Sequence, residues 1–192
     1  LLHLSRHEEA LEYYLLFLEE EPYRVDVLKQ AGTLARSLKD YPKAIALMET
    51  WSRYRPRETE PLVLLGEVLL EAGGENEAQT VWASIPELNL LQPSLHLQRV
   101  NILYDYYMPQ AGLEAIDEGR RILGNPYFAV FEAGFLLEEK GEEHQGWEEY
   151  FRALALTEEI EGYAEIMQRL TSLIKNGYGE ALLAVFTEME PS

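Results

Sequence analysis

The sequence predicts an all-α protein built from repeated pairs of antiparallel helices, and two observations carry this prediction. Small residues recur every 34 positions, without one insertion or deletion, at Ala10, Ala44, Ala78, Gly112 and Gly146. A period of this length is typical of a helix–turn–helix repeat. Between these small residues, apolar side chains follow the three- and four-residue spacing of helices that bury one face.

The first helix of each repeat carries the clearer pattern. We count positions from Val25, Thr59, Pro93, Tyr127 and Glu161. Leu28, Ala31 and Ala35 then form a buried stripe, and the same positions are largely apolar in later repeats. The eighth position is mostly small: Gly32, Gly66, Val100, Gly134 and Gln168. Since a residue without bulk lets another backbone approach closely, we expect the eighth and twentieth positions to face each other.

The second helix begins after a glycine turn at Gly73 and Gly141, where the first helix is expected to stop. Four positions after each 34-spaced small residue comes a large apolar side chain: Tyr14, Met48, Trp82, Ile116 and Tyr150. We expect this side chain to cover the apolar surface of the next repeat, so that the core continues along the stack. Pro22 and Pro56 close their repeats, because proline cannot continue a helix.

These residues resemble the tetratricopeptide repeat family over nearly the whole chain. We predict one domain over 1–192, a segment of a longer helical-repeat array, with a partial repeat at 1–24 and repeats at 25–58, 59–92, 93–126, 127–160 and 161–192. Segment 93–126 departs from the pattern at His96 and Val100. Segment 161–192 slips by one residue, so that Ala181 fills the small position. Pro86 is expected to shorten the second helix of segment 59–92.

The charge is unevenly distributed along the chain. Residues 1–57 hold nine Lys or Arg and nine Asp or Glu, whereas residues 58–192 hold seven and 25. Such a field repels phosphate backbones, so we expect no nucleic-acid partner. The acidic surplus either keeps an elongated surface soluble or steers a cationic partner to the C-terminal part. No apolar run is long enough to span a bilayer, so we expect no direct membrane insertion.

Motifs for chemistry are missing from the sequence. It has no phosphate loop, no GxSxG, no HExxH and no acidic calcium loop, so we predict no enzyme activity, cofactor or metal. His3 and His7 are interpreted as part of a helix end, His96 as a packed core histidine and His144 as solvated. The absence of cysteine excludes disulfides and fits a cytoplasmic or a bacterial envelope location equally. Arg53, Arg55 and Arg57 either stabilise a helix C-terminus or contact an anionic partner.

The resemblance implies a right-handed superhelix, a tetratricopeptide-like α-solenoid, whose first helices line a concave groove. Positions two, five, nine and twelve of each first helix would face that groove. The predicted partner-binding residues are Lys29, Thr33, Arg36, Val63, Glu67, Leu70, Leu97, Asn101, Tyr104, Phe128, Phe131, Phe135 and Glu138. The aromatic residues among them suit burial of a partner's apolar side chains, or else they pack on a neighbouring helix.

The sequence therefore favours a non-catalytic protein–protein interaction scaffold that binds an extended segment or a helix of another protein. Members of the family that grip a chaperone's C-terminal carboxylate use Lys and Asn in the groove. Here Thr33 and Leu64 stand where Asn is usual, so that ligand is not expected. The alternative is an assembly spacer of a bacterial envelope export system, of the exopolysaccharide or pilus type, acting through stacking or self-association. A regulatory array attached to a sensor or a DNA-binding module is a third alternative.

Overall fold

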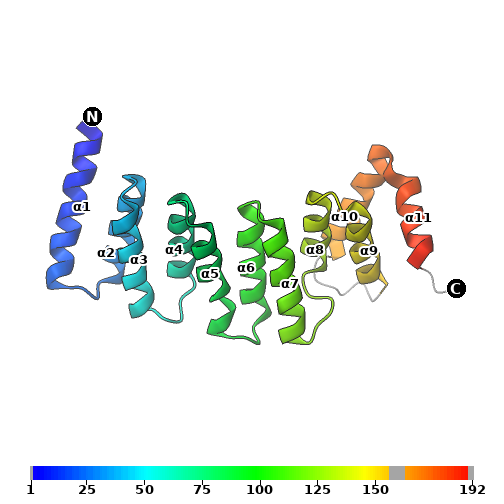
Figure 1. Ribbon diagram of the computed structural model, residues 1–192, viewed down its shortest axis with the longest axis horizontal. Coiled ribbons are helices and arrows are strands. Elements are labelled where there is room, and N and C mark those ends of the chain that lie inside the picture. The colour runs from blue at the N-terminus through cyan, green and yellow to red at the C-terminus, as the bar shows by residue number, and fades with distance from the viewer. Residues whose placement is uncertain (1, 156–162, 190–192) are drawn as a thin grey trace. The chain divides into compact units, whose positions relative to one another are not determined.

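The computed structural model describes residues 2–155 and 163–189, with side chains from Arg6 onward, and every regular element in those residues is helical (Figure 1). The helices are α1 (Leu2–Glu20), α2 (Val25–Ser37), α3 (Tyr41–Tyr54), α4 (Glu60–Glu71), α5 (Glu75–Ala83), η1 (Pro86–Leu88), α6 (Pro93–Asp105), α7 (Pro109–Leu123), α8 (Val130–Glu139), α9 (Glu143–Leu154), α10 (Tyr163–Leu173), η2 (Ile174–Tyr178) and α11 (Gly179–Met189). The prediction of an all-α chain of helix pairs is confirmed.

The chain divides into an N-terminal unit, Leu1–Leu88, and a C-terminal unit, Asn89–Ser192. In the N-terminal unit α2 packs on α3 and α4 on α5, and in the C-terminal unit α6 packs on α7 and α8 on α9. These are the first and second helices of the predicted repeats. The boundary falls inside segment 59–92, beside η1, which begins at Pro86. Helix α5 ends at Ala83, so the prediction that Pro86 shortens it is confirmed.

Glycine at the eighth position makes room for the large side chain of the second helix. A Cβ built on Gly66 would lie 2.1 Å from Nε1 of Trp82, and one on Gly134 would lie 2.2 Å from Cε1 of Tyr150. Trp82 and Tyr150 therefore pack on the first helix of their own repeat, a contact that the 34-residue pattern does not predict. The indole of Trp82 also donates a 3.2 Å hydrogen bond to the carbonyl of Val63 in that helix.

Segment 93–126 solves the same packing problem with different volumes. Its eighth position is Val100 and its large position is Ile116, and both are almost fully buried. Compared with the repeats that combine glycine with Trp82 or Tyr150, the eighth residue is larger and the large-position residue is smaller, so the summed core volume changes little. Gly119 on α7 gives further space, because a Cβ there would lie 2.7 Å from the Phe128 ring.

The turn between the two helices of a repeat has the same backbone conformation four times. Lys39, Gly73, Tyr107 and Gly141 have φ of 60°, 89°, 57° and 78°. In each case the next amide donates to a carbonyl five residues back, as from Asp40 to Ala35 at 2.9 Å, which is the Schellman motif. The sequence marks two of these turns with glycine, whereas Lys39 and Tyr107 adopt the left-handed conformation at a cost.

The last hairpin differs from the others. Helix α11 packs on α9 and on η2, and the chain bends at Gly177, where φ is 95°. Ala181 is exposed, so the prediction that it fills the small packing position is wrong. The reason is that α11 packs against α9 of the preceding repeat and not along α10. The junction between the predicted repeats 127–160 and 161–192 lies outside the described residues.

Candidate functional site

One pair of positions links neighbouring first helices in both units. The twelfth position of one repeat contacts the ninth position of the next, 31 residues further on. Arg36 Nη1 lies 2.5 Å from Glu67 Oε2, and Arg169 Nε lies 2.9 Å from Glu138 Oε2. The rings of Tyr104 and Phe135 meet at the same pair of positions, edge to face, with centroids 5.3 Å apart.

In the N-terminal unit this face is ion-paired. Lys29 bonds to Glu60, and Arg36 reaches Glu71 at 2.7 Å as well as Glu67. The hydrogen bonds that Arg36 donates to Glu71 and Glu67 raise the pKa of its guanidinium further above the ordinary value. The Thr33 hydroxyl donates to the carbonyl of Lys29 at 2.8 Å, within its own helix. Lys29, Arg36 and Glu67 therefore already have partners within this unit, and Val63 and Leu70 are half-buried.

In the C-terminal unit the same face is aromatic. Phe131 and Phe135 on α8 have ring centroids 6.3 Å apart, and Tyr104 on α6 packs against Phe135. Together with Asn101 and Glu132 these three rings line a pocket of about 220 Å³. Phe131 also stacks on the buried Tyr150, at 6.3 Å between centroids. Phe131 and Phe135 thus pack on neighbouring rings, and they are only half-buried and also line this pocket.

A second pocket adjoins the first and shares Tyr104 with it. It has a volume of about 250 Å³ and is lined by Tyr104, Tyr107, Pro109, Leu136 and Glu139. Sequence reasoning did not identify Tyr107, Glu132 or Glu139 as site residues. Tyr107 could have been found, because it occupies the turn position that is glycine in two other repeats. A bulky residue at such a strained position suggests a role outside the turn itself.

Two predicted groove residues lie in the interior. Phe128 is 6% exposed and packs edge to face on His96, so it is part of the core. The Glu138 side chain is 6% exposed and accepts hydrogen bonds from Trp147 Nε1 at 2.8 Å and Tyr150 Oη at 3.3 Å, besides that from Arg169. Burial, reinforced by this carboxylate, raises the pKa of Tyr150. Glu138 therefore joins α8, α9 and α10. Neither Phe128 nor Glu138 exposes enough of its side chain to contact a partner.

The remaining predicted residues of this face, Leu97 and Asn101, lie on α6 with Tyr104. Leu97 is half-buried, and Asn101 and Tyr104 are exposed. Helix α6 contacts α8, and α8 contacts α10, so these first helices are neighbours within the C-terminal unit. The structure thus brings five predicted residues onto two adjacent helices: Leu97, Asn101, Tyr104, Phe131 and Phe135.

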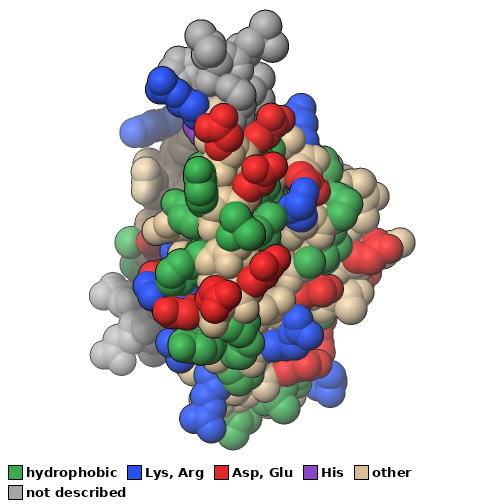
Figure 2. Space-filling view, turned by 90° about the vertical axis from the view of Figure 1, so that its left-hand side faces the viewer, with side chains coloured by type: hydrophobic (Ala, Val, Ile, Leu, Met, Phe, Trp, Pro, Cys, Tyr) green, Lys and Arg blue, Asp and Glu red, His purple; other side chains and the backbone are tan. Residues whose placement is uncertain are grey.

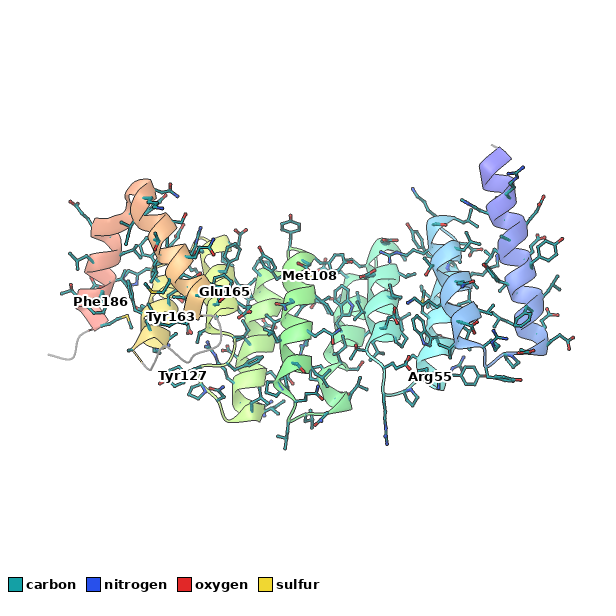
Figure 3. All side chains as sticks on the ribbon, turned by 180° about the vertical axis from the view of Figure 1, so that it is seen from behind. Arg55, Met108, Tyr127, Tyr163, Glu165 and Phe186 are labelled. Carbon is teal, nitrogen blue, oxygen red and sulfur yellow. The ribbon has the colours of Figure 1, made fainter. Side chains whose placement is uncertain are left out.

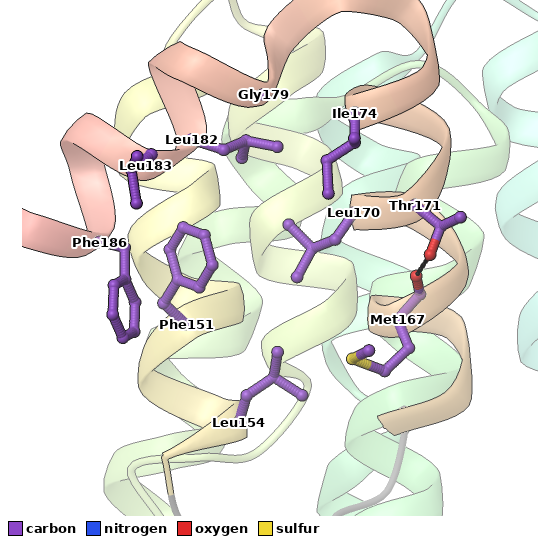
Figure 4. A pocket seen from close by; sticks show the side chains of 10 residues that line it. All are labelled: Phe151, Leu154, Met167, Leu170, Thr171, Ile174, Gly179, Leu182, Leu183 and Phe186. Carbon is purple, nitrogen blue, oxygen red and sulfur yellow. Dashed lines mark hydrogen bonds between the residues drawn. The ribbon is translucent and has the colours of Figure 1, made fainter.

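A larger apolar cleft opens where the last hairpin fails to close (Figure 4). It has a volume of about 540 Å³, with Phe151 and Leu154 of α9 at its base and α10 and α11 as walls. Ile174, Leu183 and Phe186 are 59%, 64% and 46% exposed. The Thr171 hydroxyl donates to the Met167 carbonyl at 2.7 Å, so the polar group in the lining is satisfied. Among the residues that the structure describes, no charged side chain lines this cleft.

Helix α1 of the N-terminal unit also has an apolar outer face. Tyr13, Leu16 and Phe17, which share one side of the helix, are exposed. Figure 2 looks toward this end of the chain and shows hydrophobic side chains mixed with acidic and basic ones.

The described histidines are spread along the chain, and the arginine cluster lies at the C-terminal end of α3 and just after it. His96 is buried, with Nε2 2.8 Å from the carbonyl of Leu90, so its interpretation as a core histidine is confirmed. His144 is exposed and lies 3.1 Å from Glu188. His7 is exposed, and the His3 side chain lies outside the described residues. Arg55 follows α3 and pairs with Glu58 at 3.5 Å (Figure 3). Across residues 2–155 and 163–189 no group of three metal-ligating side chains comes together.

No helix in the described part of the chain combines the length and apolar character that crossing a membrane requires. No protein-family model and no curated protein sequence matches the chain.

Solved structures are similar to this chain. One crystal structure of MamA gives a TM-score of 0.51 at 14% identity, over 89% of this chain and 92% of that one. Another MamA structure gives 0.49 at 16% identity, over 79% and 82%. YrrB, described as a TPR protein with an unusual peptide-binding site, gives 0.48 at 18% identity, over 89% and 86%. Together with the helix pairs described above, the similarity shows that this chain has a tetratricopeptide-like helical-repeat fold.

Proposed function

We propose that this chain is a non-catalytic scaffold that binds a segment of another protein on the first helices of its C-terminal unit. The observation that carries the proposal is the pair of pockets that share Tyr104, lined by residues of α6, α7 and α8 and by Tyr107. Aromatic anchors that are rigid and only partly buried are typical of protein-binding hot spots. An extended segment or a helix laid across α6 and α8 would place its side chains in these pockets.

The equivalent face of the N-terminal unit supports the choice by contrast. There Lys29 and Arg36 already bond to carboxylates of the next repeat. A partner would have to break those ion pairs before it could form its own. Replacing one exposed ion pair by another yields little binding free energy. The aromatic face needs no such exchange, because apolar and ring surface is simply removed from water.

Photo-crosslinking tests the proposal directly. Benzoylphenylalanine in place of Asn101, which lines the first pocket, should crosslink to one short segment of a partner protein in cells that express the chain. The double variant Tyr104→Ala and Phe135→Ala should lower the crosslink yield at least about tenfold, as expected for loss of a hot spot. Mass spectrometry of the crosslinked peptide identifies the segment.

The matched control places benzoylphenylalanine at Gln110, which is exposed on the second helix α7. Crosslinks from Gln110 that are stronger than those from Asn101, and that survive the double variant, would contradict the proposal. Melting of the double variant is measured in parallel, because Phe135 packs partly on Phe131.

A second candidate function, stacking by self-association, is favoured by the open cleft of the last hairpin. The apolar face of α1 from a second copy, with Tyr13, Leu16 and Phe17, would be its occupant. Such a head-to-tail contact produces rings or filaments. The light-scattering mass should then rise with concentration, and Leu183→Glu should abolish the rise whereas Ala181→Glu, on the same helix but outside the cleft, should not. A mass of one chain at every concentration would exclude this function.

A further inference from the structure

We infer that the two pockets around Tyr104 recognise cationic side chains, so that the partner segment presents lysine or arginine and not only apolar residues. This inference rests on the proposed function and specifies the chemistry of its ligand. The two pockets are lined by the same kinds of side chain. Each combines aromatic rings with one glutamate, Glu132 in the first pocket and Glu139 in the second.

Rings and a carboxylate act together on a cation. The face of an aromatic ring carries the negative part of its quadrupole, so it attracts an ammonium or guanidinium group. A carboxylate at the rim adds direct charge attraction. An apolar side chain would fill the same space, but it would remove water from the exposed carboxylate of Glu139 without offering a positive group in return.

The charges of the surrounding unit point the same way. Residues 89–192 hold seven Lys or Arg and 18 Asp or Glu. Five of the seven basic side chains already form ion pairs with carboxylates: Arg99, Arg120, Lys140, Arg152 and Arg169. The acidic surplus is therefore left to act on solvent and on any partner, and it favours an approaching cation.

The molecule itself seats cations on aromatic rings in both units. The guanidinium carbon of Arg169 lies 5.6 Å from the Phe135 ring centroid, and Nζ of Lys29 lies 5.7 Å from the Trp51 ring. Glu138 balances the charge of Arg169 at 2.9 Å. A ring with a carboxylate beside it is thus an arrangement that already holds an arginine within this chain, and Tyr104 with Phe131 and Glu132 offers the same pair of groups from the pocket.

Choline and its uncharged carbon isostere dimethylbutanol form the test, because they differ in charge and hardly in shape. Both are titrated into the protein while the aromatic NMR signals of Tyr104, Phe131 and Tyr107 are followed. We expect choline to bind about fivefold more tightly than the isostere, the ratio that an exposed cation–π contact with a nearby carboxylate supplies. Raising the salt concentration should narrow this ratio.

Glutamine variants assign the effect to the pockets. Glu132→Gln and Glu139→Gln should each weaken choline binding and leave the isostere unchanged. The matched control, Glu180→Gln on α11, removes the same charge from an exposed site outside both pockets and should change neither ligand. Equal binding of the two ligands, or tighter binding of the isostere, would overturn the cationic preference while the crosslinks from Asn101 still stand. Absence of any shift at the pocket rings would also overturn it, and the crosslinks then decide the proposed function separately.

Discussion

The two units use the same pair of helix positions for different chemistry. In the N-terminal unit the twelfth and ninth positions hold Arg36 and Glu67, an ion pair that is partly exposed. In the C-terminal unit they hold first Tyr104 and Phe135 and then Glu138 and Arg169, of which Glu138 is buried. The backbone thus brings the same two positions together each time, and the side chains decide whether the contact is a salt bridge, a ring pair or a buried network.

The periodic packing and the surface chemistry therefore depend on separate residues. Glycines such as Gly66 and Gly134 fix how close the helices of one repeat lie. Residues such as Arg36 and Tyr104 face the neighbouring repeat and can vary without changing that distance.

Glu138→Ala should destabilise the C-terminal unit by about 3 kcal/mol, because it leaves Arg169 without its carboxylate and removes the acceptor of Trp147 and Tyr150. Arg36→Ala, at the equivalent position of the N-terminal unit, should cost about 1 kcal/mol or less, since its pairs are partly exposed. Chemical denaturation followed by tryptophan fluorescence measures both.

Glu139→Ala is the control for this pair, because Glu139 is exposed and adjacent in sequence. Its effect should stay within about 0.5 kcal/mol, as is usual at the surface. Similar costs for Glu138→Ala and Arg36→Ala would remove the distinction between the two faces.

Gly66→Ala and Gly134→Ala should each cost about 2 kcal/mol, because the new methyl group collides with Trp82 or Tyr150. Equal costs in the two units would show that the packing of a repeat is common to both. Gly179→Ala is the matched control, since the nearest atom to its Cβ is 3.9 Å away. It should be neutral or slightly stabilising, because alanine favours the helix. A neutral Gly134→Ala would mean that Tyr150 moves aside freely.

Asp40 offers a pH test of the N-terminal unit. Its side chain accepts from the amide of Lys43 at 3.3 Å as the N-cap of α3, and the hydrogen bond from the Lys43 ammonium is the main cause that lowers its pKa below the ordinary 3.8. The stabilisation is complete above the unfolded pKa and is lost as the pH falls through the folded one. Asp40→Ala should cost about 1 kcal/mol at neutral pH, and the difference from wild type should shrink below about pH 4. A difference that is constant with pH would show that the charge does not contribute.

Tyr107→Gly and Lys39→Gly should stabilise the chain by about 0.5 kcal/mol each. Glycine adopts a positive φ without strain, and this relief exceeds the larger conformational entropy that glycine gains in the unfolded chain. Gly73→Ala should act in the opposite direction. Thermal melting measures the three changes. In addition, Tyr107→Gly should weaken choline binding in the second pocket, whereas Lys39→Gly should not. Equal choline affinity of the two variants would show that the Tyr107 ring does not contribute to the pocket.

Much of the fold could be predicted because its signal is local. The 34-residue spacing of small residues located the helix pairs, and Pro86 located the end of α5. The last hairpin could not be predicted, since Ala181 satisfies the pattern while α11 packs on α9. For the site, position in the repeat placed Tyr104 and Phe135 among the expected groove residues, and the structure brings these two rings into contact. It could not tell that Glu138 and Phe128 are buried, because burial depends on Trp147, Arg169 and His96 from other helices.

Glu138 has a consequence for how the C-terminal unit unfolds. In an array of repeats, cooperativity depends on the interactions between neighbouring repeats more than on the stability of each one. Glu138 accepts hydrogen bonds from α9 and from α10, so the stability of two neighbouring hairpins depends on one carboxylate. If α10 detaches, an uncompensated anion remains inside the preceding repeat, so that repeat loses stability at the same moment and the two should melt as one.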